Sequence, residues 1–451
     1  MLIGNLAASP NIIYIIPDDH TFRDFGFMGS KDALTPNIDR LAERSARFVN
    51  GYVPSSLCSP SLAVMLTGLY PHQSGLHYNH PPPGNSAFNR MNSVAEYEAA
   101  RSPVFKIIRK LPTLPRVLGE RDYLSLQTGK FWEGHYSNAG FSDGMTIFKP
   151  RPGQDYGGNR TLRSGVLAAH GNGDHGLQIG RETMQPIAEF MDRSIQEKKP
   201  FFVWYAPYLP HLPHDSPPRY HELHRKRGAA AHRIPYLAAI SQFDDTVGEL
   251  MTMLEKRGLT NNTLIVLCSD NGWTPSTKPS KKNPAEFEGT KESKYSPFEE
   301  GLRTPILFSL PGKVKPATHE EPVSSVDMLP TVLEACGFAD AIPNLPGRSL
   351  WKAALGEEAL KTQPVFGEVY PGDAETLGQP EKHIAYRWLR DGDFKLIVPH
   401  SHGGDKPWGS YLKEPALFNL KDDPEEKQNL ASSQPEVLQS LLQKLNAWWN
   451  P

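Results

Sequence analysis

The chain has 451 residues, of which 38% are hydrophobic and 22% charged, and its formal net charge is −2 at pH 7. This length predicts two domains or one large domain. The small net charge argues against a nucleic-acid partner or a membrane-surface protein, and no apolar run approaches the roughly 18 residues that a membrane span needs. The three cysteines are widely spaced and odd in number, which argues against a disulfide framework.

The first predicted element is a short apolar run at residues 11–16, rich in β-branched side chains. Such a run predicts a strand that is buried on both faces of an α/β sheet. Asp18 and Asp19 follow it directly. Ligands of open α/β sheets bind beyond the carboxyl ends of the strands, and paired carboxylates are hard oxygen donors suited to Ca²⁺ or Mg²⁺. A solvated turn is the alternative explanation for such a pair by itself.

The next two predicted elements are helices. Residues 36–48 have the apolar spacing of an amphipathic helix. A second helix is predicted to begin near Pro60, because proline is tolerated only in the first turn. Cys58 stands just before it, where the positive potential of a helix N-terminus favours a thiolate or another anion. A buried structural cysteine is the alternative, since free cysteine behaves mostly as a small hydrophobe.

Two further buried strands are predicted at residues 201–205 and 264–268, with a long helix between them at residues 234–257. Strands that alternate with helices favour a three-layer α/β core around a mostly parallel, mixed sheet. Ser269, Asp270, Asn271 and Gly272 follow the later strand, as the aspartate pair follows the first. The two strand ends together predict one divalent-cation site. Its predicted protein ligands are Asp18, Asp19, Asp270 and Asn271.

The C-terminal part has a different pattern. A helix is predicted at residues 327–337, and two short strands are predicted within residues 383–398 around the turn at 391–393. A closing amphipathic helix is predicted at residues 435–449. We therefore expect a catalytic domain over residues 10–350 and a smaller α+β subdomain over residues 351–451. The polar, Lys-rich segment 276–294 predicts a loop.

Several motifs resemble those of one enzyme family. Residues 57–68, LCSPSLAVMLTG, resemble the type I sulfatase signature C-x-P-S-R-x-x-x-L-T-G. Other segments resemble further motifs of that family, in the family's order. They are the opening strand with its aspartate pair (10–19), the G-K dipeptide (129–130), P-H-x-P (210–213), the second metal motif (269–272), K-x-x-x-Y-E-G-G-x-R-x-P (294–305) and the C-terminal L-[YF]-[DN]-L-x-x-D-P-x-E-x-x-N-L-A pattern (417–431). The ordered set resembles the formylglycine-dependent sulfatases of the alkaline phosphatase-like superfamily.

This resemblance implies an alkaline-phosphatase-like fold and the chemistry of a sulfuric ester hydrolase. It implies that Cys58 is oxidised after synthesis to formylglycine (3-oxoalanine), whose hydrate is the nucleophile. The modified Cys58 side chain would also join the four predicted ligands around Ca²⁺, with Mg²⁺ as the alternative. Lys130 would hold the hydrate, Lys294 would neutralise the sulfate group, and His211 would protonate the leaving oxygen.

The chain departs from the family pattern at two positions. Leu62 stands where the signature has arginine, which implies a tolerant maturation route or an unconverted cysteine. The family's histidine two residues after the G-K lysine is absent, and His135 is the first histidine that follows Lys130. His135 is a candidate to replace it or to bind substrate, and the alternative is that His135 has no part in the site. His72 and Arg303 are predicted to bind substrate, and His77, His80 and His214 lie in loops near the motifs.

The sequence therefore predicts a hydrolase of organic sulfate esters, with a sulfated small molecule or polysaccharide as substrate. A phosphonate monoester or phosphodiester hydrolase of the same superfamily is one alternative. A catalytically impaired carbohydrate-binding relative is another, because of Leu62. The expected partner is a formylglycine-generating enzyme or an anaerobic sulfatase-maturating enzyme, and the family implies a periplasmic or extracellular location. The first nine residues lack the basic region of a complete export signal.

Overall fold

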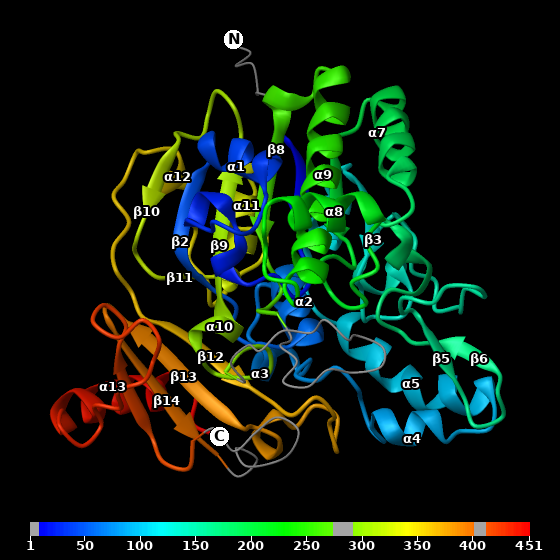
Figure 1. The fold of residues 1–451 in the computed structure, drawn as a ribbon. Helices are drawn as coiled ribbons and strands as arrows, with labels where there is room; N and C mark the ends of the chain where they lie inside the picture. Colours follow the sequence, from blue (N-terminus) through cyan, green and yellow to red (C-terminus); the bar gives the residue numbers. More distant parts are fainter. Residues whose placement is uncertain (1–8, 274–291, 401–411) are drawn as a thin grey trace.

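The computed structural model describes residues 9–273, 292–400 and 412–451. Its largest element is a mixed sheet with the strand order β10-β2-β9-β8-β1-β7-β3-β4, in which β11 also pairs with β2 (Figure 1). The strands are β1 (Asn11–Ile15), β2 (Ala46–Tyr52), β3 (Leu124–Gly129), β4 (Asp143–Gly144), β7 (Phe201–Ala206), β8 (Thr263–Cys268), β9 (Arg303–Ser309), β10 (Ala317–His319) and β11 (Val323–Ser324). The central strands β8, β1, β7 and β3 run parallel, whereas β9 is antiparallel to β8 and to β2.

Helices cover both faces of this sheet, which confirms the predicted three-layer α/β core (Figure 1). Alternate residues of β1 belong to two separate cores, with Ile12 and Tyr14 in one and Ile13 and Ile15 in the other. Because strand side chains alternate between faces, a strand buried on both sides is apolar throughout. The helices are α1 (Pro36–Glu43), α2 (Cys58–Thr67), α3 (Pro71–Ser74), α4 (Asn85–Asn89), α5 (Val94–Ile108), α6 (Leu114–Gly119), α7 (Gln185–Glu197), α8 (Pro218–Lys226), α9 (Ile234–Lys256), α10 (Glu299–Leu302), α11 (Met328–Ala335) and α12 (Trp351–Ala354).

A small antiparallel sheet and a last helix form the C-terminal part (Figure 1). They comprise β12 (Val365–Val369), β13 (Tyr386–Asp391), β14 (Phe394–Pro399), β15 (Ala416–Asn419) and α13 (Pro435–Trp448). The hairpin predicted around residues 391–393 is present as β13 and β14. Helix α12 still packs in the main core through Trp351, so the domain division at residue 351 stays a prediction. A two-stranded ribbon, β5 (Asn159–Thr161) with β6 (Leu167–Ala169), lies apart from both sheets.

One helix prediction was wrong at its end. The helix predicted over residues 36–48 stops at Glu43, and β2 begins at Ala46. The residues after the helix pair antiparallel with β9, with Phe48 opposite Ile306, and this pairing overrides the helical spacing of the apolar side chains. Most of the predicted loop 276–294 lies outside the described residues. Within the described ranges, no helix combines the length and apolar character of a bilayer span.

A buried charge cluster joins the two sheets. Lys395 on β14 is fully buried, and its Nζ lies 3.0 Å from Glu299 Oε1 and 2.9 Å from Glu426 Oε1. Tyr52 on β2 donates a hydrogen bond of 2.8 Å to the other oxygen of Glu299. One ammonium thus neutralises carboxylates from two segments that resemble family motifs, and it holds the small sheet against the region that carries Lys294.

Replacing Lys395 with methionine is expected to lower the free energy of unfolding by about 3–5 kcal/mol, because two buried carboxylates lose their countercharge. Urea denaturation measures this change. Lys444→Met is the matched control, since Lys444 pairs with Asp391 at the surface and should contribute at most about 1 kcal/mol. Equal stabilities of the two variants would contradict the structural role of the cluster.

Candidate active site

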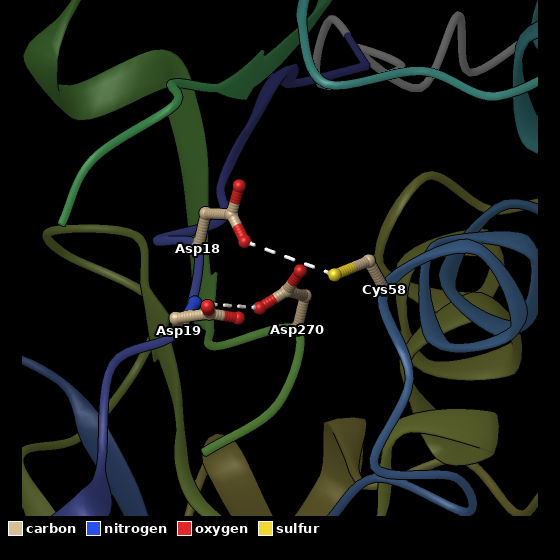
Figure 2. A group of neighbouring side chains, drawn as sticks. All are labelled: Asp18, Asp19, Cys58 and Asp270. Atoms are coloured by element: carbon tan, nitrogen blue, oxygen red, sulfur yellow. Dashed lines mark hydrogen bonds between the residues drawn. The ribbon is translucent and has the colours of Figure 1, made fainter. Parts of the chain in front are cut away.

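The strand order brings the predicted site residues to one edge of the sheet. Asp18 and Asp19 follow β1, and Asp270 and Asn271 follow β8, which pairs with β1 in parallel. The carboxyl ends of these strands therefore meet, as the sequence predicted. Asp19 has a left-handed backbone with φ of 62°, and its backbone N–H donates a 3.0 Å hydrogen bond to Asp270 Oδ1. This bond joins the two strand ends (Figure 2).

Cys58 reaches the same edge from a different element. It is the first residue of α2 and is only 1% exposed. Its Sγ lies 4.0 Å from Asp18 Oδ1, and it points toward the aspartates (Figure 2). Ligand atoms of Asp18, Asp19, Cys58 and Asp270 all lie within 4.8 Å of one another. The strand β2 that precedes α2 is antiparallel to β9, so its end lies at this edge of the sheet.

Two buried lysines complete the cluster. Lys130 follows β3, and its Nζ lies 2.9 Å from Asp18 Oδ1 and 3.1 Å from Cys58 Sγ. Lys294 precedes β9, and its Nζ lies 2.5 Å from Asp19 Oδ1. Gly129 permits this approach, because its φ is 74° and a Cβ there would lie 1.8 Å from a backbone oxygen of β7. One ammonium therefore lies beside Cys58 and the other beside Asp19.

Burial controls the charges in this cluster. It raises the pKa of Asp18 to about 7, against the opposing effect of Lys130. Burial also acts on Asp19, but the ammonium of Lys294 and other positive charges outweigh it and hold the pKa of that carboxyl well below its usual value. The pKa of the Cys58 thiol is raised to about 12, mainly by burial. The unmodified side chain is therefore a protonated thiol at neutral pH, although a helix N-terminus alone would favour the thiolate.

The side chains at the end of β8 fit a hard cation. Asp270 Oδ2 and Asn271 Oδ1 are buried, and neither has a hydrogen-bond partner among the described residues. Asn271 Nδ2 donates a 2.7 Å bond to Asp19 Oδ1, which turns its amide oxygen away from that carboxylate. Buried polar atoms are nearly always partnered, and oxygen atoms of this kind suit Ca²⁺ or Mg²⁺.

His211 lies beside the acidic cluster, in the loop after β7. Its Nε2 is 3.5 Å from Asp19 Oδ2, and its Nδ1 is 2.6 Å from the carbonyl oxygen of Leu212. Since a carbonyl can only accept, Nδ1 carries a hydrogen. Burial lowers the pKa of His211 to about 4. Its side chain is 21% exposed, so it borders the solvent side of the cluster.

The structure does not bring three of the predicted residues into this cluster. His135 bonds to Ser137 and packs on Tyr136. His72 lies 2.8 Å from Glu368 and stacks on Trp449 at the small sheet. Arg303 donates to the backbone of β2 and covers the ring of Phe22.

Tyr208 is an aromatic residue of the site that sequence reasoning missed. The ring of Tyr208 lies 5.2 Å from Lys130 Nζ and stacks on His211, with the ring centroids 4.4 Å apart. Its only signal in the sequence is its place in the loop after β7, three residues before that histidine. Burial raises the pKa of Tyr208 above its ordinary value, so the phenol keeps its proton.

The chain belongs to the sulfatase family. The family model "Sulfatase" matches residues 10–338, and the model "N-sulphoglucosamine sulphohydrolase, C-terminal" matches residues 293–449. This membership, together with the site at the carboxyl edge of the sheet, defines a sulfuric ester hydrolase of the alkaline phosphatase-like superfamily.

Named relatives cover nearly the whole chain. Human arylsulfatase A is 28% identical over an alignment that covers 97% of this chain and 87% of the relative. The N-acetylgalactosamine-6-O-sulfatase of Bacteroides thetaiotaomicron is 25% identical over 98% of this chain and 94% of its own length. The crystal structure of the PsFucS1 sulfatase from Pseudoalteromonas superposes with a TM-score of 0.70 over 97% of this chain and 89% of that one, at 20% identity, which supports the fold.

Proposed function

We propose that this protein hydrolyses carbohydrate sulfate esters with a formylglycine derived from Cys58 and one divalent cation, Ca²⁺ or Mg²⁺. The observation that carries the proposal is the position of the Cys58 Sγ, 3.1 Å from Lys130 Nζ and within 4.8 Å of ligand oxygens from three aspartates. A raised thiol pKa makes unmodified Cys58 a poor nucleophile. The site therefore suits a modified side chain better than a thiolate.

Each residue has a role that its position supports. The formylglycine hydrate would supply the attacking oxygen, and the cation would supply Lewis-acid stabilisation of the sulfate oxygens. Asp18, Asp19, Asp270 and Asn271 would hold that cation. Lys130 would orient the side chain at position 58, to which its ammonium already points.

Two further residues would complete the reaction. Lys294 would bind a sulfate oxygen, because its ammonium is buried at the cluster and sulfate is an anion. His211 would protonate the leaving alkoxide, since its side chain borders both the cluster and solvent. That role requires the bound sulfate ester to raise the pKa of His211 from its value of about 4.

The relatives support the proposed substrate class. Relatives named for action on N-acetylgalactosamine 6-sulfate, from dog and from Bacteroides thetaiotaomicron, are 26% and 25% identical to this chain. The two lysines in the cluster suit an anionic ester. We propose a sulfated sugar as substrate. The periplasmic or extracellular location stays a prediction.

Paired kinetics test this function against the phosphoryl alternative. Protein co-expressed with a formylglycine-generating enzyme is assayed on 4-nitrophenyl sulfate, on bis(4-nitrophenyl) phosphate and on three sugars. The sugars are N-acetylgalactosamine 4-sulfate, N-acetylgalactosamine 6-sulfate and glucosamine 6-sulfate. We expect the highest kcat/KM on one of the sugars. A higher kcat/KM on the phosphodiester would establish the alternative, and no turnover of any ester by fully converted protein would establish an impaired binding protein.

Leu62 motivates a prediction about maturation. It is 3% exposed within α2, all of whose residues are buried, so it offers no charge to a modifying enzyme or to the site. Beside a formylglycine-generating enzyme, Leu62→Arg is expected to raise the formylglycine fraction, as measured by peptide mass spectrometry. Burying the unpaired guanidinium is expected to lower the free energy of unfolding by about 3 kcal/mol.

Leu62→Met is the matched control, because a volume-conserving change should cost less than about 1.5 kcal/mol and add no charge. It should leave the formylglycine fraction at the parent value. Complete conversion of Cys58 in the parent protein would show that maturation is not impaired, and that the modifying enzyme accepts leucine.

A further inference from the structure

A group of three ring side chains lies next to the reacting centre and has no role in the chemistry described above. Trp132 follows Lys130 by two residues, and its ring lies 6.0 Å from Lys130 Nζ. The rings of His80 and His170 each lie 5.9 Å from that of Trp132, and 5.7 Å from one another. We call these three residues the ring triad.

The ring triad comes from three separate parts of the chain. His80 lies between α3 and α4, Trp132 follows β3, and His170 follows β6. Other contacts hold these positions. His80 Nδ1 lies 2.9 Å from Asp373 Oδ1. Next to Trp132, the backbone N–H of Phe131 donates a hydrogen bond to the backbone oxygen of Asn172. The triad is therefore a built feature of the fold.

Several polar atoms of this region lack partners. Trp132 Nε1, His170 Nδ1 and Asn172 Oδ1 are buried and have no hydrogen-bond partner among the described residues. Trp132 is 7% exposed and Asn172 is 5% exposed. Unpartnered donors and acceptors in such positions call for a ligand or ordered water. The His80 side chain is 16% exposed, which gives this region an opening to solvent.

The chemistry of the region suits a sugar. An indole face packs against the C–H face of a pyranose ring, and nearby ring nitrogens and an amide oxygen can bond to its hydroxyl groups. Two guanidinium groups lie close by. Arg101 Nη2 is 3.5 Å from the carbonyl oxygen of Gly171, next to His170, and Arg160 donates to Asn85. These cations favour a saccharide that carries negative charge.

The distances also place a sugar here. Lys130 Nζ lies 3.1 Å from Cys58 Sγ and 6.0 Å from the centre of the Trp132 ring. The distance from Cys58 Sγ to the Trp132 ring therefore cannot exceed the sum of these two distances, a gap that a sulfate group and the sugar ring carrying it can span.

We propose that the ring triad, with Asn172, is a saccharide subsite that binds the sugar ring bearing the scissile sulfate and thereby sets substrate preference. This rests on the proposed function, because the ester must be a carbohydrate sulfate. Trp132 is a binding residue here and takes no part in bond breaking.

The test compares Trp132→Leu with Trp351→Phe. Trp351 is also 7% exposed but lies on α12, and it is the matched control. Two substrates are used. One is whichever of the three sulfated sugars named above has the highest kcat/KM, and the other is 4-nitrophenyl sulfate, which has no sugar. For Trp132→Leu we expect KM for the sugar to rise about tenfold, which corresponds to a loss of roughly 1.4 kcal/mol. Its kcat/KM on the sugar should fall much more than that on the aryl ester.

Tryptophan fluorescence gives a second readout that needs no turnover. The desulfated forms of the three sugars are titrated into the parent protein. We expect at least one of them to quench the tryptophan fluorescence. This quenching should be lost in Trp132→Leu and kept in Trp351→Phe. An equal loss of kcat/KM on both substrates would overturn the subsite and assign Trp132 to the positioning of Lys130. Unchanged sugar KM, or quenching that persists in Trp132→Leu, would also overturn it. If the parent hydrolyses no sulfate ester but a sugar still quenches Trp132, the proposed function fails and the subsite stands.

Discussion

Cys58→Ala is expected to reduce sulfate ester hydrolysis by about 10⁴-fold or more, because the variant cannot form the nucleophile. The side chain lies at the first turn of α2, surrounded by Asp18 and Lys130. Removing the sulfur removes one small buried group, so the protein should stay folded. Steady-state kinetics on 4-nitrophenyl sulfate measure the loss, and thermal denaturation checks the fold.

Cys336→Ala is the matched control for this substitution. Cys336 is also buried, at 5% exposure, but its Sγ faces Tyr123 at the far side of the core. Its replacement should cost stability and leave kcat near that of the parent. Activity of Cys58→Ala at the parent level would end the proposal that residue 58 supplies the nucleophile.

Asp270→Ala is expected to remove the bound cation and to lower kcat/KM by about 1000-fold, since Lewis-acid stabilisation contributes several kcal/mol to such reactions. Asp270 provides one oxygen that accepts from the backbone of Asp19 and one buried oxygen without a partner in the described structure. Metal analysis of the purified variant by mass spectrometry measures the loss directly. Chelation of the parent protein should have the same effect on activity, and added Ca²⁺ or Mg²⁺ should reverse it.

Asp327→Asn is the control for burial of a carboxylate. Asp327 is 5% exposed, and burial raises its pKa to about 6, but it caps the turn before α11 by accepting from Ser324. The Asp327→Asn variant should lose stability and retain the bound cation. A full metal content in Asp270→Ala would show that cation binding does not depend on the end of β8.

The central strands were predictable because their signal is local. A strand buried on both faces must be apolar at every position, and the runs that became β1, β7 and β8 have this property in any context. The helix predicted over residues 36–48 was wrong at its end for the opposite reason. Its last residues have apolar side chains that suit a helix or a strand, and pairing with β9 decided between them.

The cluster of candidate metal ligands was predictable in part from the same local signals. Oxygen-rich residues directly after two buried strands predicted Asp18, Asp19, Asp270 and Asn271, and the parallel pairing of β1 and β8 brings them together. The resemblance to a family supplied Lys130, His211 and Lys294, because single lysines and histidines carry no local signal of a site. It also suggested His135, His72 and Arg303, whose contacts lie elsewhere in the structure.

The amino-acid pattern alone was therefore sufficient for the fold class, the buried strands and the ligand-rich strand ends, since these depend on neighbours along the chain. Only the tertiary structure decided which other strands bring residues to the ends of β1 and β8, and which charges are buried. Lys130 and Lys294 face Asp18 and Asp19 because β3 and β9 end or begin at the edge where β1 ends. The protonation of Cys58 was decided in the same way, since burial by distant segments outweighs the local potential of the α2 N-terminus.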